Sequence, residues 1–380
     1  MPDHADPFGE ARRLSGVMPV HVTGETIPLV LRLQDVRKAA NDCKNFSSDH
    51  PFKVVLHTEE NLRSVRQLPI ETDPPDHTDY RKLVEPMFRR PLQAPYQKKI
   101  ATLTRQAVAD ALASVEIEAV HNFALPLQSR ALTHLLGMPA AEAETWIKWG
   151  IHVFHPGDGT ASPSVNLEDY VIAQFARAVQ APSDDFFSIL NAATFRGRPL
   201  SLSEKMGYAS VAFAGGRDTI IHTVSSILAH LGDHPAALDF LRADEARLTT
   251  ATEEYVRYVS PLTAIARTCP KAAAVADTPI PSGSRIGLCW PSANRDESVF
   301  SHPHDLVLDR KPNPHVGFGF GPHNCLGAPH ARLLIRSLLK ALCDQVHHLE
   351  LLAANPKMEH ESTFTRQVGY EFVRVRFVGR

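Results

Sequence analysis

The stretch 317–327 constrains this chain more than any other. It reads Gly-Phe-Gly-Phe-Gly-Pro-His-Asn-Cys-Leu-Gly, and its glycines let the backbone turn tightly and approach a flat, bulky group closely. Leucines recur at helical spacing after Ala328, so Cys325 lies near the unpaired N–H groups at the start of a predicted helix. Such N–H groups favour a thiolate over a thiol, and a thiolate is an electron-donating ligand for iron. The stretch therefore predicts a cysteine that binds iron.

Three other interpretations of this stretch stay open at this point. A dinucleotide-binding fingerprint needs G-x-G-x-x-G after a strand and an acidic residue about 20 positions later, whereas the spacing here is G-x-G-x-G near the end of the chain. Zinc could be bound by His323, Cys325 and His330, but no second cysteine lies nearby. Cys325 could also be a structural cysteine, because free cysteines usually belong to the core.

A long helix is predicted at about 202–232, and two adjacent glycines interrupt its middle. It begins with a capping box, Ser201 and Glu204. Gly215 and Gly216 stand side by side within it, and each costs roughly 1 kcal/mol relative to alanine. Either a cofactor or substrate lies against the bare backbone, or another helix crosses closely at this point.

The cysteine stretch resembles the haem-ligand signature of the cytochrome P450 family, Phe-x-x-Gly-x-His/Arg-x-Cys-x-Gly. Every fixed position of that signature is met. The resemblance implies that the chain binds haem b (iron-protoporphyrin IX), with Cys325 as the ligand of the iron. The cofactor-binding residues that it implies in this stretch are Phe318, Gly319, His323, Cys325 and Gly327.

The segment over 214–219 of the long helix, Ala-Gly-Gly-Arg-Asp-Thr, is similar to the family's Ala/Gly-Gly-x-Asp/Glu-Thr motif. In the family, this motif lies on a helix that passes over the haem. The resemblance implies that Ala214 and Gly215 lie against the cofactor. It also implies that Asp218 and Thr219 are catalytic: Thr219 would hold oxygen or a water by hydrogen bonding, and Asp218 would link that site to bulk protons. Arg217 occupies the variable position, where it either pairs with Asp218 or points outward.

His77 and Arg81 are spaced i, i+4 and share one face of a predicted helix, which by itself is equally typical of a solvated face. The family carries a His-x-x-x-Arg pair that binds a haem propionate, and the resemblance implies this role here. Arg267 and His323 align with further propionate partners. Cationic hydrogen-bond donors stabilise a carboxylate that is buried in the protein interior.

Glu254 and Arg257 match the family's Glu-x-x-Arg pair, which braces the segment that leads to the ligand loop. An exposed pair at this spacing contributes little by itself. The family usually completes the pair with a further basic residue. Asp305 stands where an arginine is often found, so His304 is the candidate for this third member.

Helical patterns dominate the chain, and no linker divides its 380 residues, so we expect one large domain over 1–380. The resemblance implies the P450 fold, mainly α with a minor β region. Residues 46–75 predict a loop that could cover a pocket, and 156–163 a lid hinge. Strands are predicted near Val20 and over 27–33, where Pro28 favours an edge position or a strand start, near Ile265, over 285–290, and in a hairpin over 362–378. The predicted helices are 34–42, 77–90, 95–114, 123–137, 141–154, 167–181, 184–194, 202–232, 235–242 and 245–259.

Composition excludes several classes of partner. A net charge of −2 gives no global basic field, so we expect no nucleic-acid partner. The first seven residues are polar and acidic, and no later run reaches the ~20 apolar residues that a membrane span requires, so we expect no membrane association. An odd set of cysteines without paired spacing indicates a reducing cytoplasm. These are Cys43, Cys269, Cys289, Cys325 and Cys343.

We therefore expect a cytoplasmic, monomeric monooxygenase that inserts one atom of molecular oxygen into its substrate. Residues near the open face of the haem are predicted to be apolar or small, which favours a small hydrophobic substrate, a terpenoid or an aromatic, altered by hydroxylation or oxidative dealkylation. The alternatives are a peroxide-driven peroxygenase on the same fold and a non-enzymatic haem sensor. The predicted lining residues are Phe213, Ala214, Gly215, Leu262, Ala264 and Val368.

No flavin or iron–sulfur domain is attached, so electrons should come from a separate ferredoxin or flavodoxin and its reductase. Arg332, Arg336 and Lys340 repeat every four residues and predict a basic stripe on the helix after Cys325. With Arg89 and Arg90, this stripe would suit an acidic partner, although a solvated helix face is an equally good interpretation.

Overall fold

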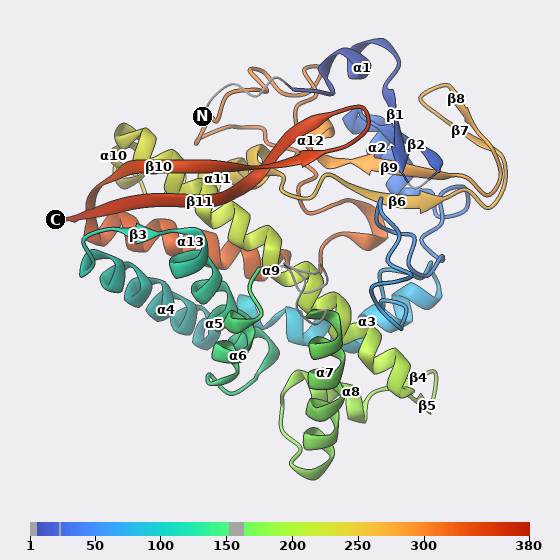
Figure 1. Cartoon of the computed structure of the whole chain (residues 1–380), viewed down its shortest axis with the longest axis horizontal. Helices are drawn as coiled ribbons and strands as arrows, with labels where there is room; N and C mark the ends of the chain where they lie inside the picture. The colour runs from blue at the N-terminus through green and yellow to red at the C-terminus, as the bar shows by residue number, and fades with distance from the viewer. Residues whose placement is uncertain (1–5, 23, 152–162) are drawn as a thin grey trace.

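Helix α9 (Leu202–Asp233) crosses the middle of the molecule, and several other helices and the C-terminal hairpin pack against it (Figure 1). The structure is a computed structural model that describes residues 6–22, 24–151 and 163–380. The predicted capping box is present at the start of α9. The Ser201 side chain accepts a hydrogen bond from the Glu204 backbone N–H, and the Glu204 carboxylate accepts one from the Ser201 N–H. The helix predicted over 202–232 is confirmed.

Most other helices lie close to their predicted ranges. Helix α6 ends at Lys148 rather than near 154, because Gly150 takes the left-handed conformation (φ 74°) that glycine adopts without strain. The predicted lid hinge at 156–163 lies outside the described residues, apart from Pro163, where α7 begins. The remaining bounds are α1 (Gly9–Leu14), α2 (Leu33–Asn41), α3 (Asp76–Phe88), α4 (Ala94–Leu112), α5 (Leu125–Leu136), α6 (Glu142–Lys148), α7 (Pro163–Gln180), α8 (Phe186–Ala192), α10 (Pro235–Arg242), α11 (Ala246–Val259), α12 (Trp290–Ala293) and α13 (Ala328–Gln345).

The larger sheets lie along the upper side of the molecule in Figure 1, whereas a small hairpin of β4 (Thr194–Phe195) and β5 (Arg198–Pro199) lies apart from them at the lower right. A four-stranded sheet has the order β1-β2-β9-β6, and a three-stranded sheet has the order β10-β11-β3. Two small hairpins, β4–β5 and β7–β8, complete the described strands. Their bounds are β1 (Val17–Val22), β2 (Glu25–Val30), β3 (Ile117–Glu118), β4 (Thr194–Phe195), β5 (Arg198–Pro199), β6 (Ala264–Thr268), β7 (Ala273–Val275), β8 (Thr278–Ile280), β9 (Arg285–Cys289), β10 (Val346–His360) and β11 (Thr365–Gly379).

Two predictions about strands are corrected. The final hairpin begins at Val346, directly after α13, and not near 362. The sequence of β10 does not alternate cleanly, because four register shifts against β11 interrupt its pairing. Strand β2 lies inside its sheet rather than at an edge, but its pairing with β9 involves only Leu29 and Val30. Pro28 precedes that pairing, so its missing N–H breaks no bond to β9.

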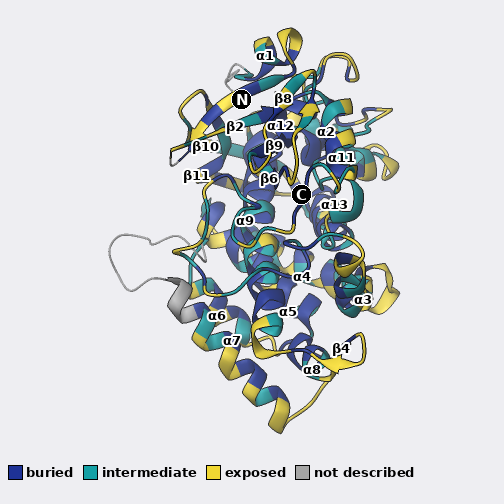
Figure 2. Cartoon of the chain, turned by 90° about the vertical axis from the view of Figure 1, so that its right-hand side faces the viewer, coloured by how far each residue is buried: buried dark blue, intermediate teal, exposed yellow. Residues whose placement is uncertain are grey.

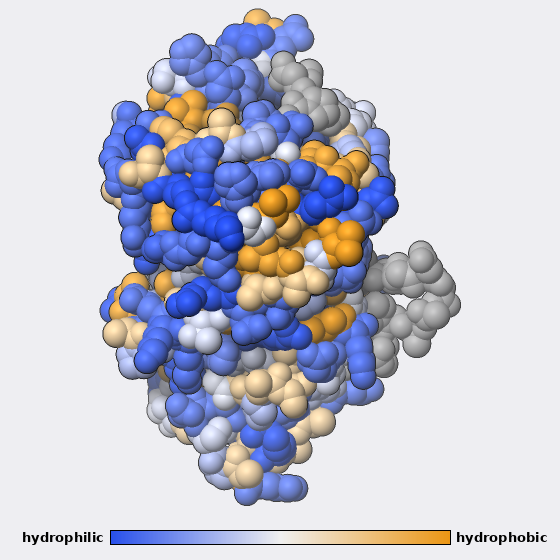
Figure 3. All heavy atoms as spheres, turned by 90° about the vertical axis from the view of Figure 1, so that its left-hand side faces the viewer, coloured by the Kyte–Doolittle hydropathy of each residue, from blue (hydrophilic) through white to orange (hydrophobic). Residues whose placement is uncertain are grey.

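Apolar side chains form one large core among the helices and two smaller cores beside the four-stranded sheet. Figure 2 shows the buried residues along the inside of the molecule. The face in Figure 3 is mostly hydrophilic, with hydrophobic atoms gathered near its middle, as is usual for folded proteins, in which apolar atoms contribute more than half of the surface. None of the described helices is long and apolar enough to cross a membrane.

The predicted loop over 46–75 contains no helix or strand, and it packs on the first half of α9. The Leu68 N–H donates a hydrogen bond to the Gly207 carbonyl at 3.3 Å, and Gln67 Nε2 donates to Ser210 Oγ at 3.2 Å. A buried ion pair between Arg63 and Glu71 holds the loop together from within. The loop is therefore anchored to the helix that carries the predicted catalytic residues.

Candidate active site

The stretch 317–327 forms a tight loop that ends where α13 begins. Gly319 and Gly321 have φ values of 72° and 73°, in the left-handed region that favours glycine. A Cβ atom at Gly321 would lie 2.6 Å from Asn41 Oδ1, so only glycine lets the loop lie against the end of α2. The Cys325 N–H closes the loop with a hydrogen bond of 2.8 Å to the Phe318 carbonyl.

Cys325 is exposed, although protein surrounds it closely. Burial raises the pKa of its thiol overall, and the backbone N–H groups of Gly327 and Ala328 and the Arg81 guanidinium oppose that rise. These groups stabilise an anionic sulfur, which is the form that binds a metal. The other cysteines are less accessible: Cys43 is half-buried, and Cys269, Cys289 and Cys343 are buried.

Four of the predicted cofactor-binding side chains gather beside the loop. The rings of His77 (α3) and His323 lie 4.2 Å apart between centroids. Burial, with the nearby charges of Arg81 and Arg267, lowers the pKa of His77 to about 4 and that of His323 to about 2. Arg81 Nη1 donates to the Asn324 carbonyl at 2.9 Å, which ties α3 to the loop.

This cluster has hydrogen-bonding capacity that the described residues do not use. His77 Nδ1 and both ring nitrogens of His323 are buried without a partner. Burial lowers the pKa of Arg267 to about 10, and its Nη1 donates only to the carbonyl of Ala266. Within the described part of the chain, no carboxylate is hydrogen-bonded to these four side chains. Buried donors of this kind require an acceptor, and an anionic one suits the two arginines.

The glycine pair of α9 faces in two directions. Gly215 is exposed, and no heavy atom lies within 4 Å of the place where its Cβ would be, so it borders open space. Gly216 faces α5, where its Cβ would lie 3.6 Å from Leu132 Cδ1. Asp218 and Thr219 are half-buried. Gly215 therefore borders open space, while Gly216 lies where α5 packs on α9.

The residues predicted to line the open face differ in their exposure. Gly215 and Leu262 are exposed, and Ala214 and Val368 are half-buried. Phe213 is fully buried, with its ring edge-on to Trp146 at 5.0 Å between centroids. It lies on the opposite side of α9 from Gly215, because two residues along a helix turn the side chain by about 200°. Ala264 is also buried, as part of β6.

Comparisons with known proteins agree with this geometry. The family model described as Cytochrome P450 matches residues 169–366. Erythromycin C-12 hydroxylase of Saccharopolyspora erythraea is 30% identical over 343 residues, which cover 87% of this chain and 85% of that protein. Steroid C26-monooxygenase of Mycolicibacterium smegmatis is 31% identical over 295 residues, 74% of this chain and 73% of that one. The chain belongs to the cytochrome P450 family.

The fold of a P450 is equally clear in the comparison of structures. A solved structure described as a carbohydrate active P450 superimposes with a TM-score of 0.96, at 43% sequence identity, and covers 99% of this chain and 98% of that chain. The expected fold class, mainly α with a minor β region, is confirmed. The cofactor of this family is haem b. An accessible thiol backed by N–H groups and a cluster of unpaired donors fit an iron ligand and the carboxylates of that cofactor.

The brace behind the P450 ligand loop is buried, and its third member differs from the one predicted. Glu254 and Arg257 on α11 are fully buried and joined by two hydrogen bonds, 2.7 and 2.8 Å long. Arg310 Nε donates to both oxygens of Glu254 at 3.0 Å. His304 is exposed, so the prediction that it completes the brace is wrong. Arg310 is the first arginine after Asp305, and this proximity is the only signal in the sequence.

Arg217 does not point outward. Its side chain is fully buried, and its Nη2 donates to the carbonyl oxygens of Trp146, at 2.7 Å, and Gly150. Burial lowers its pKa to about 10, while the neighbouring charge of Asp218 opposes that shift. Nε and Nη1 of Arg217 are buried and have no hydrogen-bond partner among the described residues. The residue therefore joins α9 to the end of α6, at the cost of a poorly satisfied buried cation.

Replacing Arg310 tests the corrected brace. Arg310→Met leaves the buried Glu254 carboxylate with one cation fewer, so the free energy of unfolding should fall by about 3 kcal/mol. Urea unfolding measures this change. His304→Ala is the matched control and should change the same quantity by less than about 0.5 kcal/mol. A large effect of His304→Ala together with a silent Arg310→Met would restore the original assignment.

Proposed function

We propose that this chain is a haem-thiolate monooxygenase that inserts one oxygen atom of O2 into an organic substrate. The observation that carries this proposal is Cys325, an accessible thiol at the start of α13 whose sulfur faces the N–H groups of Gly327 and Ala328. Its thiolate would bind the iron. The haem, when bound, supplies the electron transfer and the oxygen chemistry. The protein residues hold the cofactor, shape the substrate site and deliver protons.

The unpaired donors beside the loop suit the carboxylates of the haem. His77, Arg81, Arg267 and His323 would donate hydrogen bonds to them, which would satisfy the buried ring nitrogens. The low pKa values of the two histidines favour neutral rings, which still carry one N–H donor each. The positive charges then come from the arginines, so the cluster would balance two carboxylates with two guanidinium groups.

Asp218 and Thr219 would deliver protons at the open face of α9. The Thr219 hydroxyl donates to the Gly215 carbonyl at 3.3 Å, which leaves its oxygen able to accept a hydrogen bond from a bound water. Asp218 is half-buried, so its carboxylate lies between the interior and the surface. An acid and an alcohol in these places argue against a peroxygenase, which needs no delivery of protons for oxygen activation, and against a sensor without turnover.

Two classes of substrate have support. Ala214, Gly215 and Leu262 offer small or apolar surface, which supports the small hydrophobic substrate predicted from the sequence, a terpenoid or an aromatic. The 43% identity to a carbohydrate active P450 over nearly the whole chain supports a sugar instead. Burial of Phe213 removes one of the apolar walls on which the first interpretation relies. For either class the reaction would be hydroxylation or oxidative dealkylation.

A separate ferredoxin or flavodoxin would supply the electrons, and α13 is the candidate docking surface. Two members of its predicted basic stripe are already paired: Arg332 with Glu253 at 2.7 Å, and Lys340 with Asp344 at 2.6 Å. Arg336 is exposed and makes no hydrogen bond or ion pair within the described part of the chain. It is therefore the member of the stripe that is best able to bind an acidic partner.

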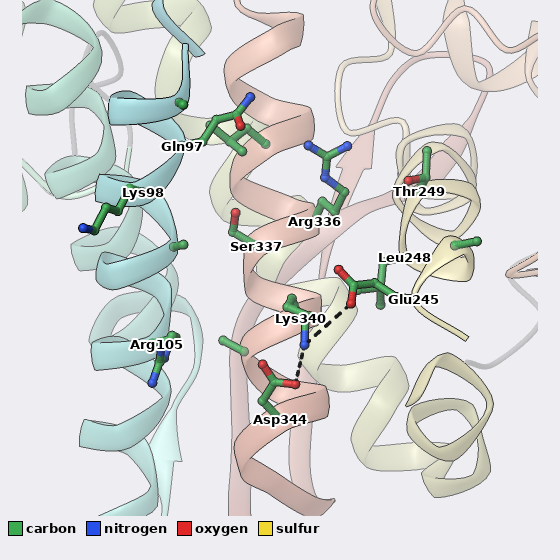
Figure 4. A pocket seen from close by; sticks show the side chains of 15 residues that line it. Gln97, Lys98, Arg105, Glu245, Leu248, Thr249, Arg336, Ser337, Lys340 and Asp344 are labelled. Atoms are coloured by element: carbon green, nitrogen blue, oxygen red, sulfur yellow. Dashed lines mark hydrogen bonds and ion pairs between the residues drawn. The ribbon is translucent and has the colours of Figure 1, made fainter. Parts of the chain in front are cut away.

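Arg336 lines a groove of about 650 Å³ between α4, α11 and α13. Figure 4 shows Arg336 on the middle helix, with Lys98 and Arg105 on α4 across from it. Small residues on the helices, such as Ala101 and Ala341, leave the groove open. The unpaired cations around it would attract carboxylates, and this attraction should weaken as salt is added.

Cys325→Ala tests the ligand assignment. The variant should lose the thiolate-type band in the carbon monoxide difference spectrum of the reduced protein, because no other side chain replaces the sulfur. Cys43→Ala, which removes a half-buried cysteine outside the loop, should keep that band. Retention of the band by Cys325→Ala would refute the proposed function.

A binding screen distinguishes the two substrate classes. Terpenoids and simple aromatics form one arm, and mono- and oligosaccharides, free and O-alkylated, form the other. A true substrate should displace water from the haem and shift its absorption spectrum, and it should then be converted with a ferredoxin and its reductase. We expect ligands from one arm only. Spectral shifts without product from any ligand would favour a haem sensor, and fast turnover with peroxide alone would favour the peroxygenase.

Arg336→Glu tests the docking surface. Reversing this unpaired charge should slow the first reduction of the haem by the ferredoxin about tenfold at low salt, and the difference should shrink at high salt. Stopped-flow absorption measures the rate. Lys271→Glu makes the same charge change at an exposed site between β6 and β7, and should leave the rate unchanged. Equal rates for the wild type and Arg336→Glu would remove α13 from the docking surface.

A further inference from the structure

Gln128 on α5 makes a contact with α9 that no sequence motif indicates. Its side chain is fully buried, and Nε2 donates a hydrogen bond to the carbonyl oxygen of Gly216. The other end of the amide, Oε1, is buried without a partner. A buried amide that is half-satisfied is costly, so its single bond should have a purpose beyond packing.

Gly216 lies at the point where α5 packs on α9. Leu132 lies one helical turn after Gln128 on α5, and its Cδ1 approaches the place where a Cβ of Gly216 would be to 3.6 Å. The two α5 side chains therefore meet α9 on the same side, at the residue without a side chain. A Cβ atom at 216 would make an ordinary van der Waals contact with Leu132, so α5 packs directly on this turn of α9.

Arg217, the next residue of α9, makes a second contact with a neighbouring helix. Its Nη2 donates to the carbonyl oxygens of Trp146 and Gly150, at the end of α6. Gly215 and Thr219 are one turn apart and border the opposite, open side of the helix. Arg217 thus contacts α6 about 200° around the helix from Gly215, on the side away from the open space, whereas Gly216 meets α5 about 100° to the side.

We propose that Gln128 is a positioning residue for oxygen activation, with Arg217 as a second anchor of the same turn. Gly215 and Gly216 weaken the helix at the turn that carries Asp218 and Thr219, since glycine is the most flexible residue. The hydrogen bond from Gln128 on α5 makes this turn of α9 more rigid, so that Thr219 keeps one orientation toward the open face. The inference rests on the proposed monooxygenase function, but the rigidity itself does not depend on it.

Gln128→Met is the test variant, because methionine has a similar length and volume but cannot donate a hydrogen bond. Hydrogen exchange of the haem-loaded protein, followed by mass spectrometry, should show about tenfold faster exchange in peptides that cover 216–222. Ser129→Ala is the matched control. Ser129 is fully buried on the same helix and its hydroxyl has no partner, so its removal should leave that exchange unchanged.

Once a substrate is known, a second measurement follows the chemistry. Gln128→Met should lower the amount of product formed per NAD(P)H about threefold or more. The electrons that no longer reach the product should reduce O2 to hydrogen peroxide, which consumes two electrons and two protons per O2. The thiolate-type band and the rate of the first reduction should stay unchanged. A role in general stability would instead lower haem content and all rates together.

Arg217→Met provides an independent variant of the second anchor, in case Gln128→Met does not fold. It should likewise speed exchange over 216–222. The proposal is overturned if exchange in both variants matches the wild type, or if Ser129→Ala speeds exchange as much as Gln128→Met. A missing thiolate band in the wild type would contradict the proposed function, whereas unchanged exchange would contradict only this inference.

Discussion

The position of the loop over 317–327 depends on one buried carboxylate, that of Glu254. Moving a carboxylate out of water costs several kcal/mol unless cations and N–H groups surround it. Here Arg257, Arg310, the Val307 N–H and Asn313 Nδ2 all donate to it, over distances between 2.7 and 3.1 Å. If the segment that leads to the loop moved away from α11, the Glu254 carboxylate would lose its donors or become exposed to solvent. That penalty holds the segment against α11.

The consequences extend directly into the loop. The Val316 N–H donates to Asn294 Oδ1 at 2.7 Å, and a Cβ at Gly317 would lie 2.7 Å from Val256 Cγ1, so the chain enters the loop pressed against α11. Gly321 then presses the far side of the loop against α2. Cys325 is the end point of this chain of contacts. Its position is therefore set by packing on two helices rather than by the loop alone.

Buried polar atoms without a hydrogen-bond partner lie beside the predicted site and also elsewhere among the described residues, including Asn313 Oδ1 in the brace. His77, His323, Gln128 and Arg217 each leave a buried nitrogen or oxygen unsatisfied, while every polar atom of Glu254 is satisfied. Each such atom carries a desolvation cost, so several of them beside one loop require an explanation. The ring nitrogens of His77 and His323 lie together beside the loop, and a ligand with acceptor groups would satisfy them.

The sequence by itself determined the features that are local. The loop and its cysteine, the capped helix with its glycine pair, and the Glu254 and Arg257 pair all lie within short stretches whose spacing carries the information. Tertiary structure alone decided the contacts between distant stretches. Arg310 reaches Glu254 across 56 positions, Arg217 reaches Trp146 across 71, and Gln128 reaches Gly216 across 88. No periodicity or motif links such residues, because the contact exists only once separate helices pack together.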